Sequence, residues 1–305
     1  MKISGFSFAR NATKLYYPIK EAIQSILPIC DEFVIAIGKG DPDDTTLEEV
    51  KSINDPKVKI IETVWDEKYM THGIIHSQQT NVALKECTGD WCFYVQADEV
   101  VHEKYLPVIK NRCEELLDDK EVEGLLFRYK HFWGDYDHYI VSHAWYPNEV
   151  RIIRNGIGVE SWKSAQSFRL NGRKLNVARV DAEIFHYGWV RPPHLMQTKT
   201  KYFYFSHWGT KKSEEYFKTQ PKEFDYGPLN RVNKYEGTYP EVMKERIQKM
   251  DWKDKLTYEG KVGIFSPNKA RHDRIKYRVV TWIEQNLMGG RQLFGYKNYN
   301  LLKNK

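Results

Sequence analysis

Short apolar runs alternate with helix-like segments four times in the first hundred residues, and this alternation limits the fold most. The runs expected to form strands are 2–8, 33–37, 58–64 and 91–95, and the helices expected between them are 14–27, 44–53 and 72–85. Strands that alternate with helices pair in parallel, because each helix carries the chain back across the sheet. The sequence therefore predicts an α/β fold with a Rossmann-like, mostly parallel central sheet flanked by helices.

The fourth run begins after Gly89 and ends at two adjacent acids, Asp98 and Glu99. Ligands of open α/β sheets bind just beyond the carboxyl ends of the strands. Two carboxylates in that position can hold a hard divalent cation, and the cation can hold a diphosphate. A solvated acidic turn is the alternative interpretation of the same pair.

Three other strand ends carry polar side chains. The stretch from Phe8 to Asn11 can line a base or ribose pocket, and the acids between Gly38 and Thr46 can accept hydrogen bonds from nucleoside hydroxyls. Farther on, His186 precedes a glycine and could bind a metal, while Arg191 could pair with a phosphate. Ordinary caps and turns are the alternative for each stretch.

Beyond residue 100 the pattern is less regular. Strands are expected at 124–132 and 149–154, with a strand pair within 174–185. Helices are expected at 103–117, 196–207, 240–250 and 270–287. The segment 133–147 is rich in aromatic residues and histidine, and indicates a long loop or hairpin of the kind that often serves function.

The charge of the chain is concentrated near its C-terminal end. Of a net charge of +6, residues 266–305 contribute nine Lys and Arg against Asp273 and Glu284. This surplus predicts contact with an anionic surface, such as the inner face of a membrane, and a solvated tail is the alternative. The four cysteines form no close pair and no run of residues is long enough to span a membrane, so a cytoplasmic protein is expected.

Together these stretches resemble the family-2-type glycosyltransferases of bacterial type, which have the GT-A fold. The resemblance covers about residues 1–210, expected to form the transferase domain, and residues 211–305 are expected to form a helical, basic extension. It rests on the strand end at Arg10, on the acidic turn 41–46, and on residues 89–99, which match the family's DxD-type metal site. His186 matches a further metal-side position, whereas Gln96 replaces the first DxD acid.

The resemblance implies an inverting transfer of a sugar from a nucleotide-diphosphate sugar to a glycan or a lipid-linked acceptor. It implies Mn²⁺ or Mg²⁺ at Asp98, with Glu99 and His186 as the other metal residues, and no nucleic-acid partner. The donor-binding positions that it implies lie at the strand ends and on the helix 72–85: Phe8, Arg10, Asn11, Gly38, Asp41, Asp44, Gln78, Asn81, Gln96, Ala97, Asp98 and Arg191.

An inverting transfer needs a carboxylate base on the acceptor side. Related enzymes often carry it in a stretch equivalent to 164–168, which contains no acid here. We therefore expect Asp135 or Glu149 to be the base, with a turn or surface acid as the alternative. The side chains expected to stack on the acceptor are aromatic, with core packing as their alternative role: Trp133, Tyr136, Trp162 and Trp189.

Two other classes of function stay open. A sugar nucleotidyltransferase also binds metal at a strand-end acid, but it usually has a glycine-rich basic loop where this chain has residues 9–12 without glycine. A non-catalytic module that binds an anionic polymer or a membrane would depend on the basic C-terminal segment alone.

Overall fold

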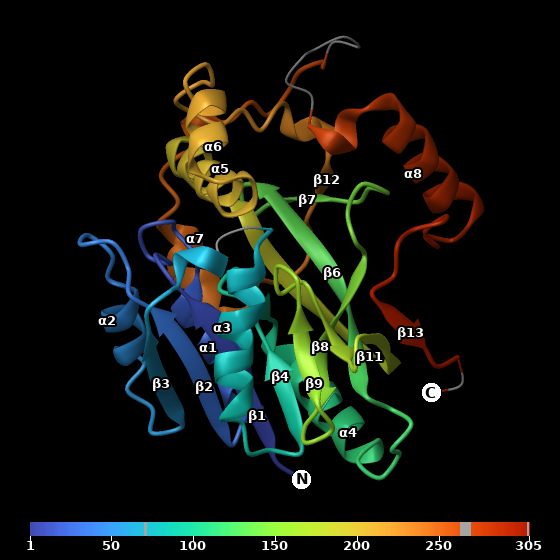
Figure 1. Ribbon diagram of the computed structural model, residues 1–305. Helices are drawn as coiled ribbons and strands as arrows, with labels where there is room; N and C mark the ends of the chain where they lie inside the picture. Colours follow the sequence, from blue (N-terminus) through green and yellow to red (C-terminus); the bar gives the residue numbers. More distant parts are fainter. Residues whose placement is uncertain (70–71, 263–269, 304) are drawn as a thin grey trace.

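We examined the fold in a computed structural model, which describes residues 1–69, 72–262, 270–303 and 305 (Figure 1). Four parallel strands form the first half of the sheet, in the order β3 (Val58–Thr63), β2 (Glu32–Gly38), β1 (Ile3–Ala9) and β4 (Trp91–Tyr94). They coincide closely with the four predicted apolar runs. The predicted α/β fold, with a mostly parallel central sheet flanked by helices, is confirmed.

Helices cover both faces of the central strand β2, which explains why it is apolar along most of its length. Residues 33, 35 and 37 of β2 pack in the same cluster as α1 (Ile19–Ile26) and α4 (Leu106–Glu115). Residues 34 and 36 pack in the opposite cluster with α3 (Ile74–Lys85). A strand buried on both faces needs an apolar side chain at every position. The short helix α2 (Thr46–Lys51) joins β2 to β3.

The second half of the sheet is mixed. β8 (Asn148–Arg154) runs antiparallel between β4 and β6 (Gly124–Gly134), and β6 pairs in parallel with β11 (Arg173–Val190). β11 continues through the region where the sequence predicts a strand pair, with register shifts that bend it rather than break it. Its other neighbours are β5 (Glu99–Val101), β10 (Ser167–Leu170) and β13 (Tyr299–Leu301), while β9 (Val159–Trp162) pairs with β10.

The predicted loop or hairpin at 133–147 is a hairpin, since β7 (His138–Ile140) turns back onto β6. The remaining short elements are β12 (Asn233–Lys234) and the 3₁₀ helices η1 (Leu27–Ile29), η2 (Glu67–Tyr69), η3 (Glu103–Tyr105), η4 (Leu229–Arg231), η5 (Glu241–Met243), η6 (Lys253–Lys255) and η7 (Arg271–Asp273).

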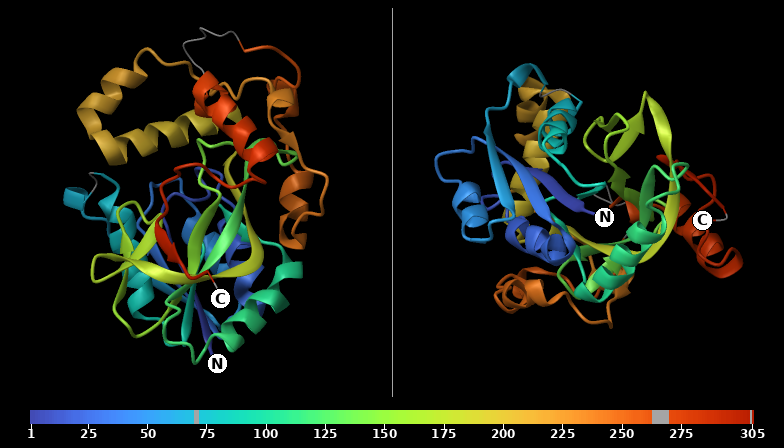
Figure 2. Two further views of the ribbon diagram at one scale, coloured as in Figure 1. Left: turned by 90° about the vertical axis from the view of Figure 1, so that its right-hand side faces the viewer. Right: turned by 90° about the horizontal axis from the view of Figure 1, so that it is seen from below.

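The later helices lie beyond one end of the sheet. Figure 2 shows α5 (Pro193–Trp208), α6 (Thr210–Phe217) and α8 (Ile275–Leu287) together at this end, while the chain begins at the other. The segment after residue 210 also contributes α7 (Lys244–Gln248), β12 and β13, so it is not helical throughout. None of the described helices combines the length and the apolar composition that a membrane span requires.

Candidate functional site

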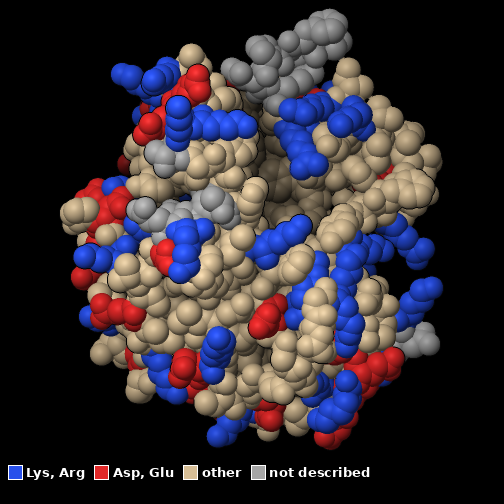
Figure 3. Space-filling model, viewed as in Figure 1, with Lys and Arg blue, Asp and Glu red and all other residues tan. Residues whose placement is uncertain are grey.

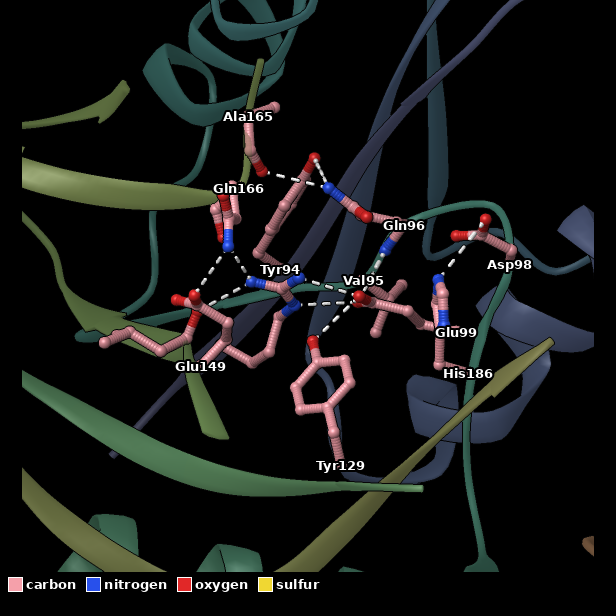
Figure 4. A network of polar contacts seen from close by, with 12 residues as sticks. Tyr94, Val95, Gln96, Asp98, Glu99, Tyr129, Glu149, Ala165, Gln166 and His186 are labelled. Atoms are coloured by element: carbon pink, nitrogen blue, oxygen red, sulfur yellow. Dashed lines mark hydrogen bonds and ion pairs between the residues drawn. The ribbon is translucent and has the colours of Figure 1, made fainter. Parts of the chain in front are cut away.

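The two acids that follow β4 have different surroundings (Figure 4). Glu99 is fully buried, and its carboxylate accepts hydrogen bonds from Arg151 Nε and Nη2 at 2.7 Å each. The hydroxyl of Tyr129 donates to the same carboxylate at 2.7 Å, and the backbone N–H of Gln96 donates at 3.1 Å. Four donors occupy the lone pairs of Glu99, so we do not retain it as a metal ligand, contrary to the prediction from the sequence.

Asp98 turns instead toward β11. Its Oδ2 atom lies 3.7 Å from Nε2 of His186. Between them, Gly188 is required, because a Cβ atom there would lie 2.6 Å from His186 Nε2 and 2.7 Å from Asp98 Oδ2. The structure therefore brings together two of the three predicted metal residues.

A second histidine fixes the tautomer of His186. His131 Nε2 lies 2.8 Å from the carbonyl oxygen of Tyr146, which can only accept, so this nitrogen carries the proton. Burial lowers the pKa of His131 to about 3, so its ring is neutral and its Nδ1 is an acceptor. The Nδ1 of His186, 3.0 Å away, must then donate to it. Burial lowers the pKa of His186 as well, and Nε2 is left with a free lone pair that faces Asp98.

Two cations lie on the other side of Asp98. Lys199 Nζ, on α5, is 3.6 Å from Asp98 Oδ2, and it donates to the carbonyl oxygen of Gly188 at 2.5 Å. Burial, followed by repulsion from Arg191, lowers the pKa of Lys199 to about 7. Burial alone would raise the pKa of Asp98, but nearby charges, among them the Lys199 and Arg191 cations, lower it. The site is therefore one carboxylate surrounded by groups that attract anions.

Arg191 itself is fully buried. It donates to the carbonyl oxygens of Leu15 and Gly188, and its guanidinium lies 4.4 Å from the centre of the Tyr17 ring. Its Nε is buried without a hydrogen-bond partner among the described residues. An unpaired buried donor of this kind is expected where an anionic ligand is missing.

The donor set fits a divalent cation only as a two-ligand site. Within the described part of the chain, no group of three or more His, Cys, Asp or Glu side chains could hold a metal. One carboxylate and one imidazole nitrogen with its lone pair free do suit Mn²⁺, and Mg²⁺ is often bound by one or two carboxylates together with substrate phosphates. A residue that orients the histidine ligand is also present, since His131 holds His186 through a hydrogen bond.

A cluster of aromatic rings, the aromatic cluster of Phe8, Trp65 and His76, lies near the ends of β1 and β2. The ring of Phe8 is stacked on His76 with the ring centres 5.6 Å apart, and Trp65 lies within 6.2 Å of both rings. The guanidinium of Arg10 is 5.3 Å from the centre of the Trp65 ring. A Cβ atom on Gly38 would meet Trp65 Nε1 at 2.2 Å, so glycine is needed there.

Several polar atoms near these strand ends have no hydrogen-bond partner in the described part of the chain. Arg10 Nε and Trp65 Nε1 are buried and make no hydrogen bond to any described residue. The same holds for Oε1 of Gln78 on α3. Unsatisfied polar groups are rare in folded proteins and often mark a ligand site. Burial also lowers the pKa of His76 to about 4, which keeps its ring neutral and suited to stacking.

The acidic turn after β2 is held by α5 and by the segment after β1. Asp41 accepts hydrogen bonds from Lys14 Nζ at 2.8 Å and from the hydroxyl of Tyr202 at 2.7 Å, and these lower its pKa to about 2. Asn11 adopts a positive φ of 55° and accepts from the Asp41 backbone N–H through Oδ1. Asp44 accepts from two threonine hydroxyls. These bonds give the predicted donor residues of the turn a structural role as well.

Other predicted donor residues are hydrogen-bonded to the protein itself. Gln96 donates to the carbonyl oxygen of Ala165 at 2.9 Å, and Ala97 is half-buried beside it. Asn81 accepts from the backbone N–H of Ser161 at 2.8 Å, which ties α3 to β9. The side chain of Asn81 is therefore already engaged with the protein.

The two candidate bases differ in their surroundings. Burial raises the pKa of Glu149, whose Oε1 accepts from Gln166 and Asn298 at 3.0 and 2.9 Å. Its Oε2 is buried without a partner among the described residues. Asp135 lies in the turn between β6 and β7 and accepts from its own turn and from His138 Nδ1 at 2.8 Å. Glu149 thus has a free oxygen.

The predicted acceptor aromatics divide between core and surface. Trp133 and Tyr136 are buried and belong to packed clusters, which is the alternative role foreseen for them. Trp189 is half-buried, stacked on Trp133 with ring centres 5.0 Å apart, and Lys199 Nζ lies 5.5 Å from the centre of its ring. Trp162 is exposed on β9.

Sequence reasoning gave no site role to several residues that the structure places at the site. Among them are Tyr17, Trp65, His76, His131, Arg151 and Lys199. In Figure 3 the surface is hollowed between the α5–α6 pair and α8, beyond the strand ends that carry the site. A substrate could therefore approach between these helices.

No protein-family model matches the chain, and no curated protein matches it. Among solved structures, residues 1–349 of S. aureus TarS match at 16% identity over 68% of this chain and 65% of that chain, with a TM-score of 0.40. The same protein in complex with UDP-GlcNAc matches at 24% identity over 43% and 35% of the two chains, with a TM-score of 0.32.

Glucosyl-3-phosphoglycerate synthase from Mycobacterium tuberculosis, in complex with Mg²⁺ and UDP, matches at 17% identity over 42% and 43% of the two chains, with a TM-score of 0.30. The chain thus spans 35–65% of the lengths of these three structures. At such identities the likeness concerns the fold.

Proposed function

We propose that this chain transfers a sugar from a nucleotide-diphosphate sugar to a glycan or a lipid-linked acceptor, with inversion at the anomeric carbon. The observation that carries the proposal is the approach of Asp98 to the free Nε2 of His186, with Lys199 and Arg191 beside them. A site that combines two metal ligands with two cations suits a leaving diphosphate better than it suits a neutral ligand.

The donor nucleotide would bind at the aromatic cluster. Its base would stack against the rings of Phe8, Trp65 and His76, and the unpaired Arg10 Nε and Trp65 Nε1 would gain acceptors from the base or the ribose. The diphosphate would then extend along the strand ends toward Asp98, as expected in an open α/β sheet.

The chain's own groups would stabilise the charge that develops as the sugar leaves. Lys199 and Arg191 would interact with the diphosphate oxygens, Arg191 through the buried Nε that has no partner among the described residues. A divalent cation held by Asp98 and His186 would supply Lewis acidity at the same oxygens. His131 would keep Nε2 of His186 free by accepting from its Nδ1.

Glu149 is our choice for the base. Its Oε1 is held by Gln166, which lies in the stretch where related enzymes often carry the base, and its Oε2 is free. Oε2 would take the proton of the acceptor hydroxyl, whose oxygen forms the new bond to the anomeric carbon. The bond from that carbon to the phosphate oxygen breaks, and its electron pair leaves with the nucleoside diphosphate. A carboxylate with a raised pKa accepts a proton readily near neutral pH. Asp135 is the second candidate.

Thermal shifts with UDP-, GDP-, dTDP- and CMP-sugars, with and without Mn²⁺, would identify the donor, because a bound ligand stabilises the folded chain. With that donor, Asp98→Asn should remove slow hydrolysis, while Asp181→Asn, at an exposed acid, should not. Glu149→Gln should lower the rate of transfer to an acceptor about 100-fold or more while donor binding persists. Unchanged turnover in Asp98→Asn would refute the proposal, and release of pyrophosphate from a nucleoside triphosphate would indicate a nucleotidyltransferase.

A further inference from the structure

Helix α8 presents an apolar stripe to the outside of the molecule. Ile275, Val279 and Trp282 are 53%, 53% and 59% exposed, and their spacing places them on one face of the helix. The opposite face is attached to the protein: the hydroxyl of Thr281 accepts from the backbone N–H of His143, and Glu284 accepts from His143 Nδ1 at 2.6 Å. The orientation of the helix is therefore fixed, with its apolar face open to solvent along the edge of a groove.

The exposed charges beside this stripe are all of one sign. Among the described residues of η7 and α8, the exposed charged side chains are Arg271, Arg274, Lys276 and Arg278. The two acids of the same segment are buried and already paired, Asp273 with Arg231 at 2.7 Å and Glu284 with His143. Figure 3 shows Lys and Arg side chains gathered where α8 begins. The outer surface of α8 therefore attracts anions.

A groove runs along the same helix. It has a volume of about 520 Å³ and lies between the stripe and the apolar side chains of Ile140, Val141 and Val232. His272, at one side of the groove, packs edge-on against Trp133 with ring centres 4.9 Å apart. Trp133 is stacked on Trp189, which adjoins Lys199. The apolar surface is thus connected by direct ring contacts to the side of the site that Lys199 occupies.

We propose that α8 lies in the interface of an anionic lipid bilayer, with the stripe of Ile275, Val279 and Trp282 among the acyl chains and the cations on the headgroups. Helices with one apolar face, a basic flank and a tryptophan lie in the plane of the membrane in this way. A second copy of the chain fits less well, because a two-fold contact through α8 would bring Arg274 and Arg278 toward their own copies. The inference concerns location and does not depend on the reaction.

Sedimentation of the full chain with vesicles tests this. It should bind vesicles that contain phosphatidylglycerol and not vesicles of phosphatidylcholine alone. Arg274→Glu with Arg278→Glu should weaken binding about tenfold or more, since each cation near an anionic surface contributes about 1 kcal/mol. Val279→Ser should also weaken it, while Val108→Ser on α4, where the valine is 41% exposed, and Lys110→Glu should not.

Point variants are needed, because deletion of residues 266–305 would also remove β13 from the sheet and Asn298 from Glu149. In a second measurement, lipids with brominated acyl chains should quench the fluorescence of the chain, and Trp282→Phe should remove most of that quenching. Equal binding to both kinds of vesicle, quenching unchanged in Trp282→Phe, or a dimer in solution that Val279→Ser dissociates would each overturn the proposal.

Discussion

The guanidinium of Arg151 and the carboxylate of Glu99 meet through two hydrogen bonds of 2.7 Å, and both side chains are completely buried. Asp98, one residue earlier, faces His186 and the two cations instead. Adjacent acids at the end of one strand therefore have separate tasks. Glu99 joins β5 to β8, whereas Asp98 is the acid to which the proposed function gives a chemical role.

This division predicts opposite effects for two conservative substitutions. Glu99→Gln leaves the Arg151 charge buried without its partner and should lower the free energy of unfolding by about 3–5 kcal/mol. Asp98→Asn should change that free energy much less while it removes activity. Urea unfolding followed by circular dichroism measures both. A double variant, Glu99→Gln with Arg151→Met, should recover part of the loss, and equal destabilisation by the two single substitutions would contradict the assignment.

The histidine pair predicts an effect on metal affinity. His131→Phe keeps a ring of similar size but removes the acceptor that holds His186 Nδ1. Mn²⁺ affinity, measured by electron paramagnetic resonance in the presence of a nucleoside diphosphate, should fall about 10–100-fold. His138→Phe, which alters a histidine bound to Asp135, is the matched control and should leave the affinity unchanged. If both variants bind Mn²⁺ as the parent does, His131 has no part in orienting a ligand.

The aromatic cluster predicts that removal of one of its rings weakens nucleotide binding. Trp65→Ala removes a ring that adjoins Phe8, His76 and Arg10, and stacking of a base on an aromatic ring is worth about 1–3 kcal/mol. The dissociation constant of the nucleoside diphosphate should therefore rise about tenfold or more in isothermal titration calorimetry. Trp162→Ala on β9 should have no such effect. Equal losses of affinity in the two variants would argue against nucleotide binding at the aromatic cluster.

A buried carboxylate away from the site predicts how stability depends on pH. Burial alone would raise the pKa of Glu32, but hydrogen bonds from Lys59, Ser4 and Thr88 lower it from 4.5 to about 2. Stability from these bonds is complete above the unfolded pKa of 4.5 and is lost as the pH falls toward 2. Glu32→Gln should lower the free energy of unfolding by about 1–3 kcal/mol at neutral pH, and the difference should shrink toward about pH 3.

Urea unfolding across this pH range provides the measurement. Glu114→Gln, at an exposed position on α4, is the control and should show little change at any pH. A difference between Glu32→Gln and the parent that stays constant between neutral pH and about pH 3 would mean that the hydrogen bonds do not favour the ionised form.

Strands β2 and β4 could be predicted from the sequence because each is buried on both faces and reads as an almost unbroken apolar run, whereas β3 keeps Lys59 and Glu62 exposed. The expectation that Asp98 and His186 share a site came from the family resemblance, and the structure places Asp98 Oδ2 3.7 Å from His186 Nε2. Sequence spacing does not predict the contact between Arg151 and Glu99. The two residues are 52 positions apart, yet Arg151 donates to the Glu99 carboxylate.

Other parts of the site come from long-range packing. Trp65 follows β3 in a segment without a periodic pattern, and Lys199 is one of two lysines on its helix. Only the folded chain places Trp65 over Gly38 and Lys199 beside Asp98. The predicted strand pair at 174–185 failed for a related reason: the register shifts of β11 disturb the alternation of side chains, although the strand continues.

The length of β11 has a consequence for the dynamics of the molecule. Between its first and last residues it is hydrogen-bonded to β10, β13, β6 and β5, so it connects the C-terminal strand to the residues that surround His186. Regions joined through one continuous hydrogen-bonded strand resist opening separately. Amide protons along β11 should accordingly exchange with solvent only when the whole domain unfolds, which makes the site and the C-terminal strand parts of one cooperative unit.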